Sequence, residues 1–191
     1  MATLVIVLRT ISLLAFAAPM MLAVSGRRGE STARSHQSVG DRAPVVANFA
    51  AVAAYLPSLL VFSSSPAGST ALLLASSGLL LAVVGVAVAL RSRIELGRAW
   101  SLLPRADEAM GLVTTGPYRL VRHPMYLGFA LLVTGQALAF GSWPALVIVV
   151  SGIVPTFAWR ARAEEELLGR AFGERWAAYR QRTSMIIPHL L

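Results

Sequence analysis

Long apolar runs, rather than an alternation of apolar and polar positions, dominate the chain. A helix needs roughly 20 apolar residues to cross the hydrocarbon of a bilayer. Five runs approach this length, at Thr3–Val24, Val45–Phe62, Ser69–Leu90, Pro124–Phe140 and Trp143–Trp159. The pattern therefore predicts an all-α fold, a polytopic membrane helical bundle of about five transmembrane helices.

The spacing of the runs also predicts how some of the helices pack. The last two runs are short and are joined by the letters GSW before Pro144, which predicts a tight antiparallel helical hairpin over 124–159. Small residues in a membrane helix allow another helix to approach closely. The third run carries such residues on nearly one stripe, at Gly78, Ala82, Gly85 and Ala89.

The segment after the last run has helical periodicity of its own. Large apolar residues recur there with arginines and glutamates between them, at Leu168, Phe172, Trp176 and Tyr179. This spacing predicts a C-terminal cytoplasmic amphipathic helix, interrupted near Gly173, that lies on the membrane or folds beneath the bundle. The chain then divides near residue 100. Residues 1–100 hold three helices and a polar loop at 25–44, and residues 101–191 hold a pre-helix loop, the hairpin and the C-terminal helix.

Composition supports the membrane interpretation and excludes several kinds of site. Of the 191 residues 56% are hydrophobic and only 14% are charged, whereas a soluble domain carries about a quarter charged residues. The chain has no cysteine, which excludes disulfides, thiolate metal sites and cysteine nucleophiles. Its three histidines, His36, His123 and His189, lack the spacing of metal ligands, so we expect no metal.

The net charge of +8 is explained by the orientation of the chain in the membrane. In a soluble protein it would suggest nucleic acid, but here the arginines lie between the apolar runs, so we expect no nucleic-acid partner. They are Arg27, Arg28, Arg34 and Arg42, then Arg91, Arg93, Arg98, Arg105, Arg119 and Arg122, then Arg160, Arg162, Arg170, Arg175, Arg180 and Arg182. The positive-inside rule puts these three segments in the cytoplasm and the N-terminus outside. Arg9 lies inside the first run, and we expect it to snorkel outward.

A first polar cluster, GPYRLVRHPMYLG, spans residues 116–128. Gly116-Pro117 is a turn signal, and Pro124 after His123 suits the first turn of a helix. The first amides of that helix lack intrahelical partners and carry partial positive charge. The polar side chains around them are Tyr118, Arg122, His123 and Tyr126. Two interpretations are open: a pocket for an anionic or hydrogen-bonding ligand, or a juxtamembrane anchor, which composition alone favours.

A second cluster, WRARAEEELLGRAFG, spans residues 159–173. Acidic residues contribute little to membrane orientation, so three consecutive glutamates here call for another explanation. Arg160 and Glu164 are four residues apart and share a helix face, which the hairpin brings close to the start of the fourth run. The pair is either a helix-surface ion pair, contributing a few tenths of a kcal/mol, or a ligand clamp. In a clamp, the carboxylate would bind a cationic or hydroxyl group and the guanidinium an anionic one.

The two clusters in this order, followed by IIP near the C-terminus, resemble the isoprenylcysteine carboxyl methyltransferase family. The wider group of that family includes the phospholipid N-methyltransferases. The resemblance covers roughly residues 110–188, and the first three runs match only as hydrophobic helices. It implies a membrane enzyme that uses S-adenosylmethionine, with S-adenosylhomocysteine as product, and that needs no metal and no Rossmann domain. The half 101–191 would bind the cofactor at the cytoplasmic side, and 1–100 would form the lipid-side entrance for a lipophilic or prenylated acceptor.

The resemblance also assigns residues. The implied cofactor contacts are Val113, Tyr118, His123, Pro124, Met125, Tyr126, Glu164 and Glu165. The implied catalytic residues are Glu164 and Arg160, and Arg160 matches an arginine that engages the substrate. The chain departs from the animal enzymes, which carry a histidine at the position of Met110 and have additional N-terminal spans. These departures bear on substrate identity more than on the cofactor.

Several functions fit these residues. The first is carboxyl O-methylation of an isoprenylcysteine-like acceptor. The alternatives within enzymes are S- or N-methylation of a small thiol, a phospholipid amine or another lipophilic metabolite. From another class, the chain could be a non-enzymatic membrane scaffold or a transporter subunit. Transporters often have inverted repeats and charges near the membrane midplane, and the sequence has no such repeat.

Overall fold

The computed structural model describes residues 2–25, 38–39, 43–64, 68–100, 105–106 and 111–188. Its helices are α1 (Ala2–Ser25), α2 (Ala43–Val61), α3 (Ser69–Leu96), α4 (Pro124–Phe140), α5 (Trp143–Ile148), α6 (Val154–Phe172) and α7 (Glu174–Arg180). Short turns of helix follow α3 at Gly97–Ala99, precede α4 at Gly116–Arg119 and join α5 to α6 as a π-turn at Val149–Ile153. Strand β1 (Ser38–Val39) pairs antiparallel with β2 (Arg105–Ala106). Met110, His36, His189 and most of the polar loop 25–44 lie outside the described residues.

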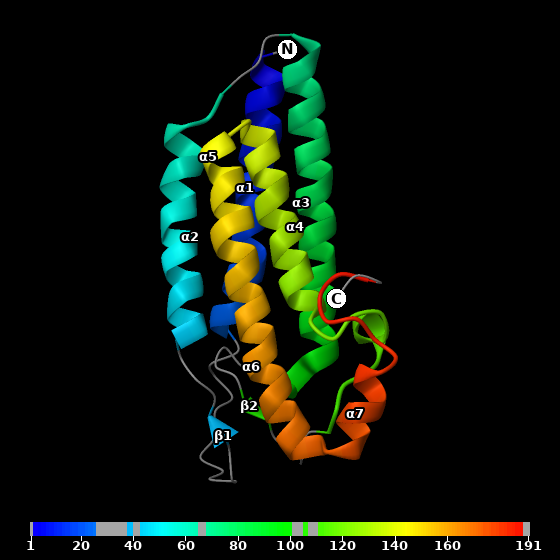
Figure 1. The fold of residues 1–191 in the computed structure, drawn as a ribbon. Coiled ribbons are helices and arrows are strands. Elements are labelled where there is room, and N and C mark those ends of the chain that lie inside the picture. Colours follow the sequence, from blue (N-terminus) through cyan, green and yellow to red (C-terminus); the bar gives the residue numbers. More distant parts are fainter. Residues whose placement is uncertain are drawn as a thin grey trace.

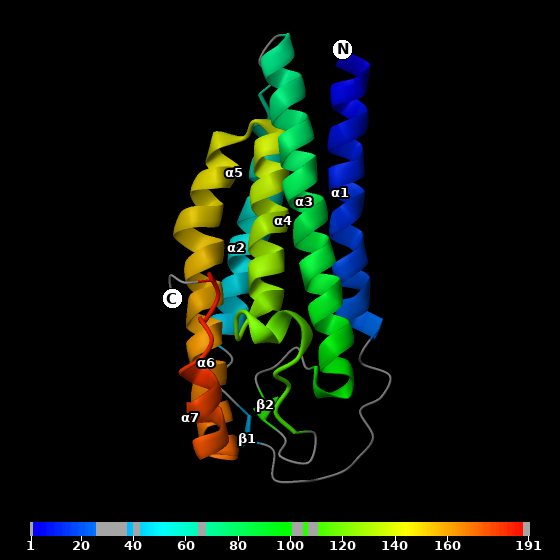
Figure 2. The same ribbon diagram turned by 90° about the vertical axis from the view of Figure 1, so that its right-hand side faces the viewer.

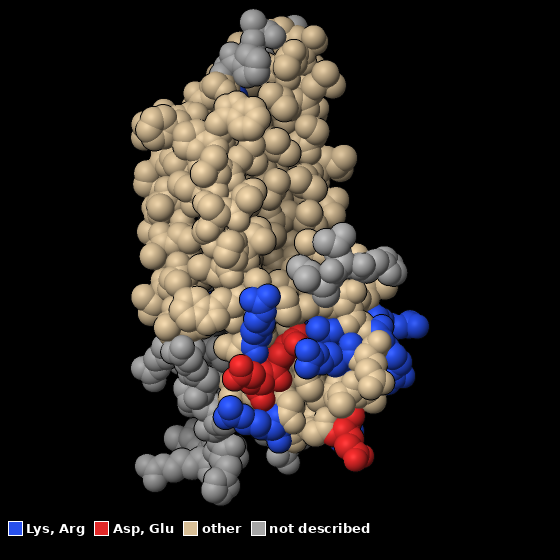
Figure 3. Space-filling model, viewed as in Figure 1, with Lys and Arg blue, Asp and Glu red and all other residues tan. Residues whose placement is uncertain are grey.

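The helices form a bundle in which α1, α2, α3, α4 and the continuous helix α5–α6 run alternately in opposite directions (Figures 1 and 2). Within the described residues, three helical segments are long and apolar enough to cross a membrane, Ala43–Val61, Ser69–Leu96 and Trp143–Phe172, and two shorter apolar helices are Ala2–Leu14 and Pro124–Phe140. Arginines and glutamates gather at one end of the face in Figure 3, which we call the charged end. The chain is thus a helical, multi-pass membrane protein.

The stripe of small residues predicted on the third run is confirmed as the contact between α3 and α4. A Cβ added at Gly85 would lie 2.5 Å from the carbonyl oxygen of Gly128, and one added at Gly135 would lie 2.5 Å from that of Gly78. The two backbones therefore touch, which only glycine allows. This contact fixes the start of α4, at the charged end, against the end of α3.

The predicted hairpin is confirmed, with one difference in length. Gly141, at φ +61°, ends α4, and the Ser142 hydroxyl accepts the amide of Ala145 at the start of α5. Sequence hydropathy ended the fifth run at Trp159, but the helix continues as α6 to Phe172. Hydropathy marks where a helix leaves the apolar layer, whereas arginine, glutamate and alanine favour its continuation in water.

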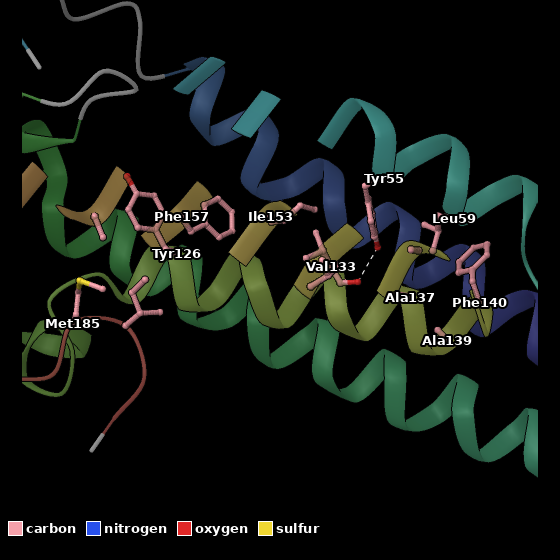
Figure 4. Packing of buried hydrophobic residues seen from close by; sticks show 14 residues of the cluster. Tyr55, Leu59, Tyr126, Val133, Ala137, Ala139, Phe140, Ile153, Phe157 and Met185 are labelled. Carbon is pink, nitrogen blue, oxygen red and sulfur yellow. Dashed lines mark hydrogen bonds between the residues drawn. The ribbon is translucent and has the colours of Figure 1, made fainter. Parts of the chain in front are cut away.

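Polar side chains inside the bundle are bonded across helices. The Tyr55 hydroxyl donates to the carbonyl oxygen of Val133 at 2.8 Å (Figure 4), and the Gln136 amide donates to that of Ser12 at 2.8 Å. Arg9, expected to snorkel outward, extends toward the end of the bundle opposite the charged end. It donates from Nε to the carbonyl oxygen of Ala139, near the end of α4, at 2.9 Å and from a terminal nitrogen to that of Ser64 at 2.8 Å. A cation at a helix C-terminus is favourable because the last carbonyls carry partial negative charge.

The C-terminal segment folds against the loop that precedes α4. Gly173, at φ +51°, separates α6 from α7. The Tyr179 side chain on α7 is buried, and its hydroxyl donates to the carbonyl oxygen of Tyr118 at 2.7 Å. Further along, Ser184 forms a parallel β-bridge with Val121. The sequence left open whether this segment lies on the membrane or folds against the bundle. In the structure it packs on the protein through Tyr179 and Ser184.

Candidate active site

The start of α4 places two aromatic rings side by side. Proline at the first helical position fixes the backbone, and the preceding His123 has non-helical angles of φ −123° and ψ 59°, because a residue before proline is disfavoured in the helical region. The amides of Tyr126 and Leu127 both donate to the His123 carbonyl oxygen, at 3.1 and 3.3 Å. The His123 and Tyr126 rings then stack with centroids 5.6 Å apart. Both side chains are buried.

Helix α6 leaves the bundle beside this point and brings its charged face to the rings. Phe157 also stacks on Tyr126, with centroids 5.2 Å apart. Two turns further along α6, Glu164 accepts a hydrogen bond from the Tyr126 hydroxyl. Arg160 lies between them on the helix, with its guanidinium carbon 5.4 Å from the centroid of the Tyr126 ring.

His123 lies between two carboxylates, as the pairing of the two sequence clusters predicted. Its Nδ1 is 3.6 Å from Glu164 Oε2, and its Nε2 is 3.4 Å from Glu165 Oε1. These are distances of ion pairs rather than of short hydrogen bonds. Arg160 contributes a terminal nitrogen 3.9 Å from Glu164 Oε1, with its own side chain only 8% exposed. One cluster at the charged end therefore contains His123, Tyr126, Arg160 and Glu164.

The two glutamates have different surroundings. Glu165 Oε1 accepts a hydrogen bond from Arg122 Nε at 2.6 Å, and Glu165 Oε2 lies 3.9 Å from Arg180 Nε. The Glu165 side chain is 10% exposed, whereas that of Glu164 is 24% exposed. Glu165 is thus engaged by the arginines that hold the C-terminal segment. Glu164 is the carboxylate that an incoming group reaches more readily.

The sequence analysis expected unpaired amides at the start of α4. The structure leaves fewer of them than expected, because amides in the first turn and just before it are occupied. The amide of Arg122 donates to the carbonyl oxygen of Ser184 at 2.8 Å, and the amide of His123 donates to that of Met185 at 2.9 Å. The amide of Tyr126 is bonded within the first turn. The sequence could not reveal this because a bridge between residues 60 positions apart leaves no periodic signal. Ligand recognition then falls to side chains.

The remaining predicted cofactor residues lie around the same helix start. Tyr118 is buried in the turn Gly116–Arg119, and Pro124 opens α4. Met125 accepts a hydrogen bond on sulfur from the Trp100 indole at 3.4 Å. Val113 lies in the segment 111–114 that leads into the turn and is partly buried. Their contact with a cofactor stays a prediction.

Sequence reasoning missed Glu95, at the end of α3. The Thr115 hydroxyl donates to Glu95 Oε1, and Arg91 lies 3.3 Å from Glu95 Oε2. A Cβ added at Gly116 would lie 2.8 Å from Glu95 Oε2, so glycine is needed there for space as well as for its φ of +57°. The spacing of Arg91 and Glu95, four residues apart in RSRIEL, was the available signal. Glu95 ties the turn that carries Tyr118 to α3.

The surroundings of His123 predict its protonation. Burial lowers the pKa of His123, but Glu164 and Glu165 outweigh burial and raise the pKa above the ordinary 6.5. The stability that charged His123 contributes is then complete below pH 6.5 and is lost as the pH rises through the raised pKa. We expect Glu165→Gln to lower this pKa, because one of the two stabilising charges is removed.

Ring NMR of the three histidines in labelled protein measures this pKa, and His123→Gln assigns the signal. Glu166→Gln is the matched control, because the Glu166 side chain is 72% exposed and pairs at 4.0 Å with Arg170. An unchanged His123 midpoint in Glu165→Gln would contradict the prediction.

In the part of the chain that the structure describes, no group of three or more acidic, histidine or cysteine side chains has the arrangement of a metal site.

Comparison with known proteins identifies the family. Residues 73–175 match the family described as phospholipid methyltransferase. The chain is 31% identical over 113 residues to protein-S-isoprenylcysteine O-methyltransferase A of Arabidopsis thaliana, covering 58% of this chain and 57% of that protein. It is 29% identical over 136 residues to the Saccharomyces cerevisiae protein-S-isoprenylcysteine O-methyltransferase, covering 70% and 56%. It is also 31% identical over 113 residues to a cobalt-zinc-cadmium resistance protein of Cupriavidus metallidurans, covering 59% and 50%. The chain thus spans little more than half the length of these relatives.

A solved structure shares the fold. It is that of the eukaryotic intramembrane Ras methyltransferase, isoprenylcysteine carboxyl methyltransferase, with a TM-score of 0.58 and 17% sequence identity. The alignment covers 93% of this chain and 63% of that one. The matched family region contains α4, the helices that flank it and both clusters of the site. The chain therefore belongs to the phospholipid methyltransferase family.

Proposed function

We propose that the protein is a membrane methyltransferase that moves a methyl group from S-adenosylmethionine to a lipophilic acceptor. Carboxyl O-methylation of an isoprenylcysteine-like acceptor is the reaction that the site supports best. One observation carries the proposal: Glu164 lies against His123, Tyr126 and Arg160, in one cluster contributed by the two motifs. The names of the relatives support the same reaction.

The residues fit the proposed cofactor. When bound, S-adenosylmethionine supplies an electrophilic methyl group on a sulfonium, and S-adenosylhomocysteine is the product. Glu164, partly exposed and negatively charged, would bind a cationic or hydroxyl-bearing part of it. The hydroxyl of Tyr126 would hold this carboxylate through its hydrogen bond, and His123 holds both carboxylates in place. The further residues proposed to line the cofactor are Val113, Tyr118, Pro124, Met125 and Glu165.

Arg160 is proposed to position the acceptor. Its side chain is 8% exposed and lies at the membrane side of Glu164 on α6. A guanidinium binds a carboxylate in bidentate fashion, so it would orient the nucleophilic oxygen and partly replace its lost hydration. A thiol or amine nucleophile would gain little from this contact. The buried guanidinium is therefore the feature that favours a carboxylate over the S- and N-methylation alternatives.

The distribution of arginines supports a topology for the proposal. Five crossings, with the charged end in the cytoplasm and the N-terminus outside, agree with the positive-inside rule. Residues 101–191 would then bind the cofactor at the cytoplasmic surface, and 1–100 would face the acceptor's path from the bilayer.

A two-part assay tests this function. Calorimetry with S-adenosylhomocysteine, on protein purified in detergent, is expected to detect binding, and its absence would favour a scaffold or transporter subunit. Methyl transfer from labelled S-adenosylmethionine is then compared for a prenylated cysteine carboxylate, a small thiol and a phospholipid amine. Methylation of only the thiol or the amine would replace the proposed acceptor and keep the enzyme class.

The variant Arg160→Ala is expected to lower turnover of the carboxylate acceptor by about 100-fold, because charged hydrogen bonds in a buried site contribute about 1.5–3 kcal/mol each. Cofactor affinity should change by less than about threefold, since Arg160 and Glu164 are 3.9 Å apart and not hydrogen-bonded at that distance. Arg162→Ala, on the exposed side of α6, is the control. Equal loss of turnover and cofactor affinity would mean that Arg160 supports Glu164 instead.

A further inference from the structure

A polar pair joins α2 to α6 within the apolar part of the bundle. Asn48 Nδ2 donates to Thr156 Oγ1 at 3.1 Å, and the Thr156 hydroxyl in turn donates to the carbonyl oxygen of Ile153 at 2.8 Å. Asn48 is 8% exposed, while its neighbour Phe49 is 47% exposed and faces outward. Polar side chains inside membrane helices are costly, so they are kept either to join helices or to bind a ligand.

Two contacts define how α2 and α6 align. Near the π-turn, a Cβ added at Gly152 would lie 3.5 Å from Ala51 Cβ, and one turn further on Thr156 meets Asn48. The helices are antiparallel (Figure 1), so another turn along α6 brings Arg160 level with the first residues of α2. In the contact between α2 and α6, the small residues Gly152 and Ala51 pack together on the side away from the charged end. Arg160 lies at the other end of this contact, at the charged end.

Thr156 begins a line of polar groups that leads to the active site. Thr156, Arg160 and Glu164 follow one another at intervals of four residues, which is about 6 Å along the axis and about 40° of rotation per step. Arg160 and Glu164 already approach to 3.9 Å. The pair therefore lies one turn from Arg160, on its bilayer side, and is the next polar group that an acceptor held by Arg160 would meet.

We propose that Asn48 and Thr156 recognise the acceptor. They would bind the hydrogen-bonding linkage, such as an amide, beside the reacting carboxylate of an amphiphile whose apolar tail stays in the bilayer. The Asn48 amide can donate to a carbonyl, and the Thr156 hydroxyl can accept from an N–H. Without an acceptor the two side chains satisfy each other. This inference rests on the proposed function and adds to it the residues that select the acceptor.

Thr156→Val tests the inference because valine has the same shape but no hydroxyl. The acceptors are an N-acyl S-prenylcysteine and the matching S-prenyl thiopropionate, which keeps the carboxylate and the tail but lacks the amide. The variant is expected to raise KM about 5- to 10-fold for the first acceptor and less than about twofold for the second. Asn48→Leu should give the same selectivity, and Thr156→Ser, which keeps the hydroxyl, should restore the wild-type ratio.

Thr134→Val is the matched control. The Thr134 hydroxyl donates to the carbonyl oxygen of Ala130 at 2.7 Å within α4, so its removal should leave both KM values unchanged. Equal changes for the two acceptors, no change for either, or loss of S-adenosylhomocysteine binding in both Thr156→Val and Asn48→Leu would overturn the inference and leave the pair as a helix joint. A wild-type protein that methylates neither acceptor refutes the proposed acceptor class, before any variant is made, and the inference with it.

Discussion

Glu164→Gln is expected to weaken S-adenosylhomocysteine binding by about 10- to 100-fold while the protein remains folded. Glutamine has the same size and its amide oxygen can still accept the hydrogen bond from Tyr126. What it removes is the negative charge, which lies 3.6 Å from His123 and 3.9 Å from Arg160. Hydrogen bonds to a charged group contribute about 1.5–3 kcal/mol, roughly one to two factors of ten in affinity.

Calorimetry on the purified variant measures the loss, and a thermal melt in the same detergent shows whether the fold persists. Glu166→Gln is the matched control, since that neighbouring side chain is exposed and should leave affinity unchanged. Tyr126→Phe separates the charge from its partner: it removes one hydrogen bond and keeps the carboxylate, so a smaller loss is expected. Wild-type affinity in Glu164→Gln would remove this residue from the cofactor site and with it the central support of the proposed function.

The helices could be predicted from the sequence because their signal is local. Runs of apolar residues locate both ends of α2 and the start of α3 to within about two residues, and the letters GSW locate the hairpin. The predicted ends are less accurate because hydropathy reports the membrane boundary and not the last helical hydrogen bond. Helix α3 continues to Leu96 and α6 to Phe172, through residues whose charges and amphipathic faces keep the helix in water.

The central cluster could be predicted for a related reason. The sequence has two short motifs at the two ends of one hairpin, so His123 and Glu164 were expected to approach each other. The hydrogen bonds around these two residues could not be predicted from the sequence. The amides of Arg122 and His123 pair with the carbonyls of Ser184 and Met185, and an isolated bridge of this kind has neither period nor turn signal. Sequence reasoning left the first amides of α4 to a ligand, and it could not foresee that the C-terminal segment pairs with the two amides just before that helix.

The contact of α3 with α4 links stability to the site. Glu95, in the last turn of α3, holds the turn before α4, and Trp100, just after α3, donates to Met125. Whatever moves α3 away from α4 therefore also moves the residues proposed to line the cofactor. The α3 glycines of this contact, Gly78 and Gly85, lie far from the charged cluster along the chain. Their substitution is nevertheless expected to affect both the melting temperature and the affinity for S-adenosylhomocysteine.

Gly85→Ala is expected to lower the apparent melting temperature by about 4–8 °C, from an overpacking cost of about 3 kcal/mol less about 1 kcal/mol of helix propensity. Alanine is favoured over glycine within a helix by about 1 kcal/mol, but the added Cβ would lie 2.5 Å from the Gly128 carbonyl oxygen and from the Leu132 amide nitrogen. Both are backbone atoms, so no rotamer change relieves the clash and the helices must separate. Overpacking costs about 1–3 kcal/mol and sometimes more, and each kcal/mol shifts the melting temperature of a chain this size by about 2–4 °C.

Gly152→Ala makes the same chemical change where the space is different. A Cβ there would meet its nearest neighbour, Ala51 Cβ, at 3.5 Å, which is an ordinary contact. The propensity gain is then unopposed, and the melting temperature should stay the same or rise slightly. A thermal melt of both variants in one detergent decides between propensity and packing. If Gly85→Ala proved as stable as Gly152→Ala, α3 and α4 could not approach each other as closely as the structure has them at Gly85 and Gly128. The link from this contact to the turn before α4 would then be lost as well.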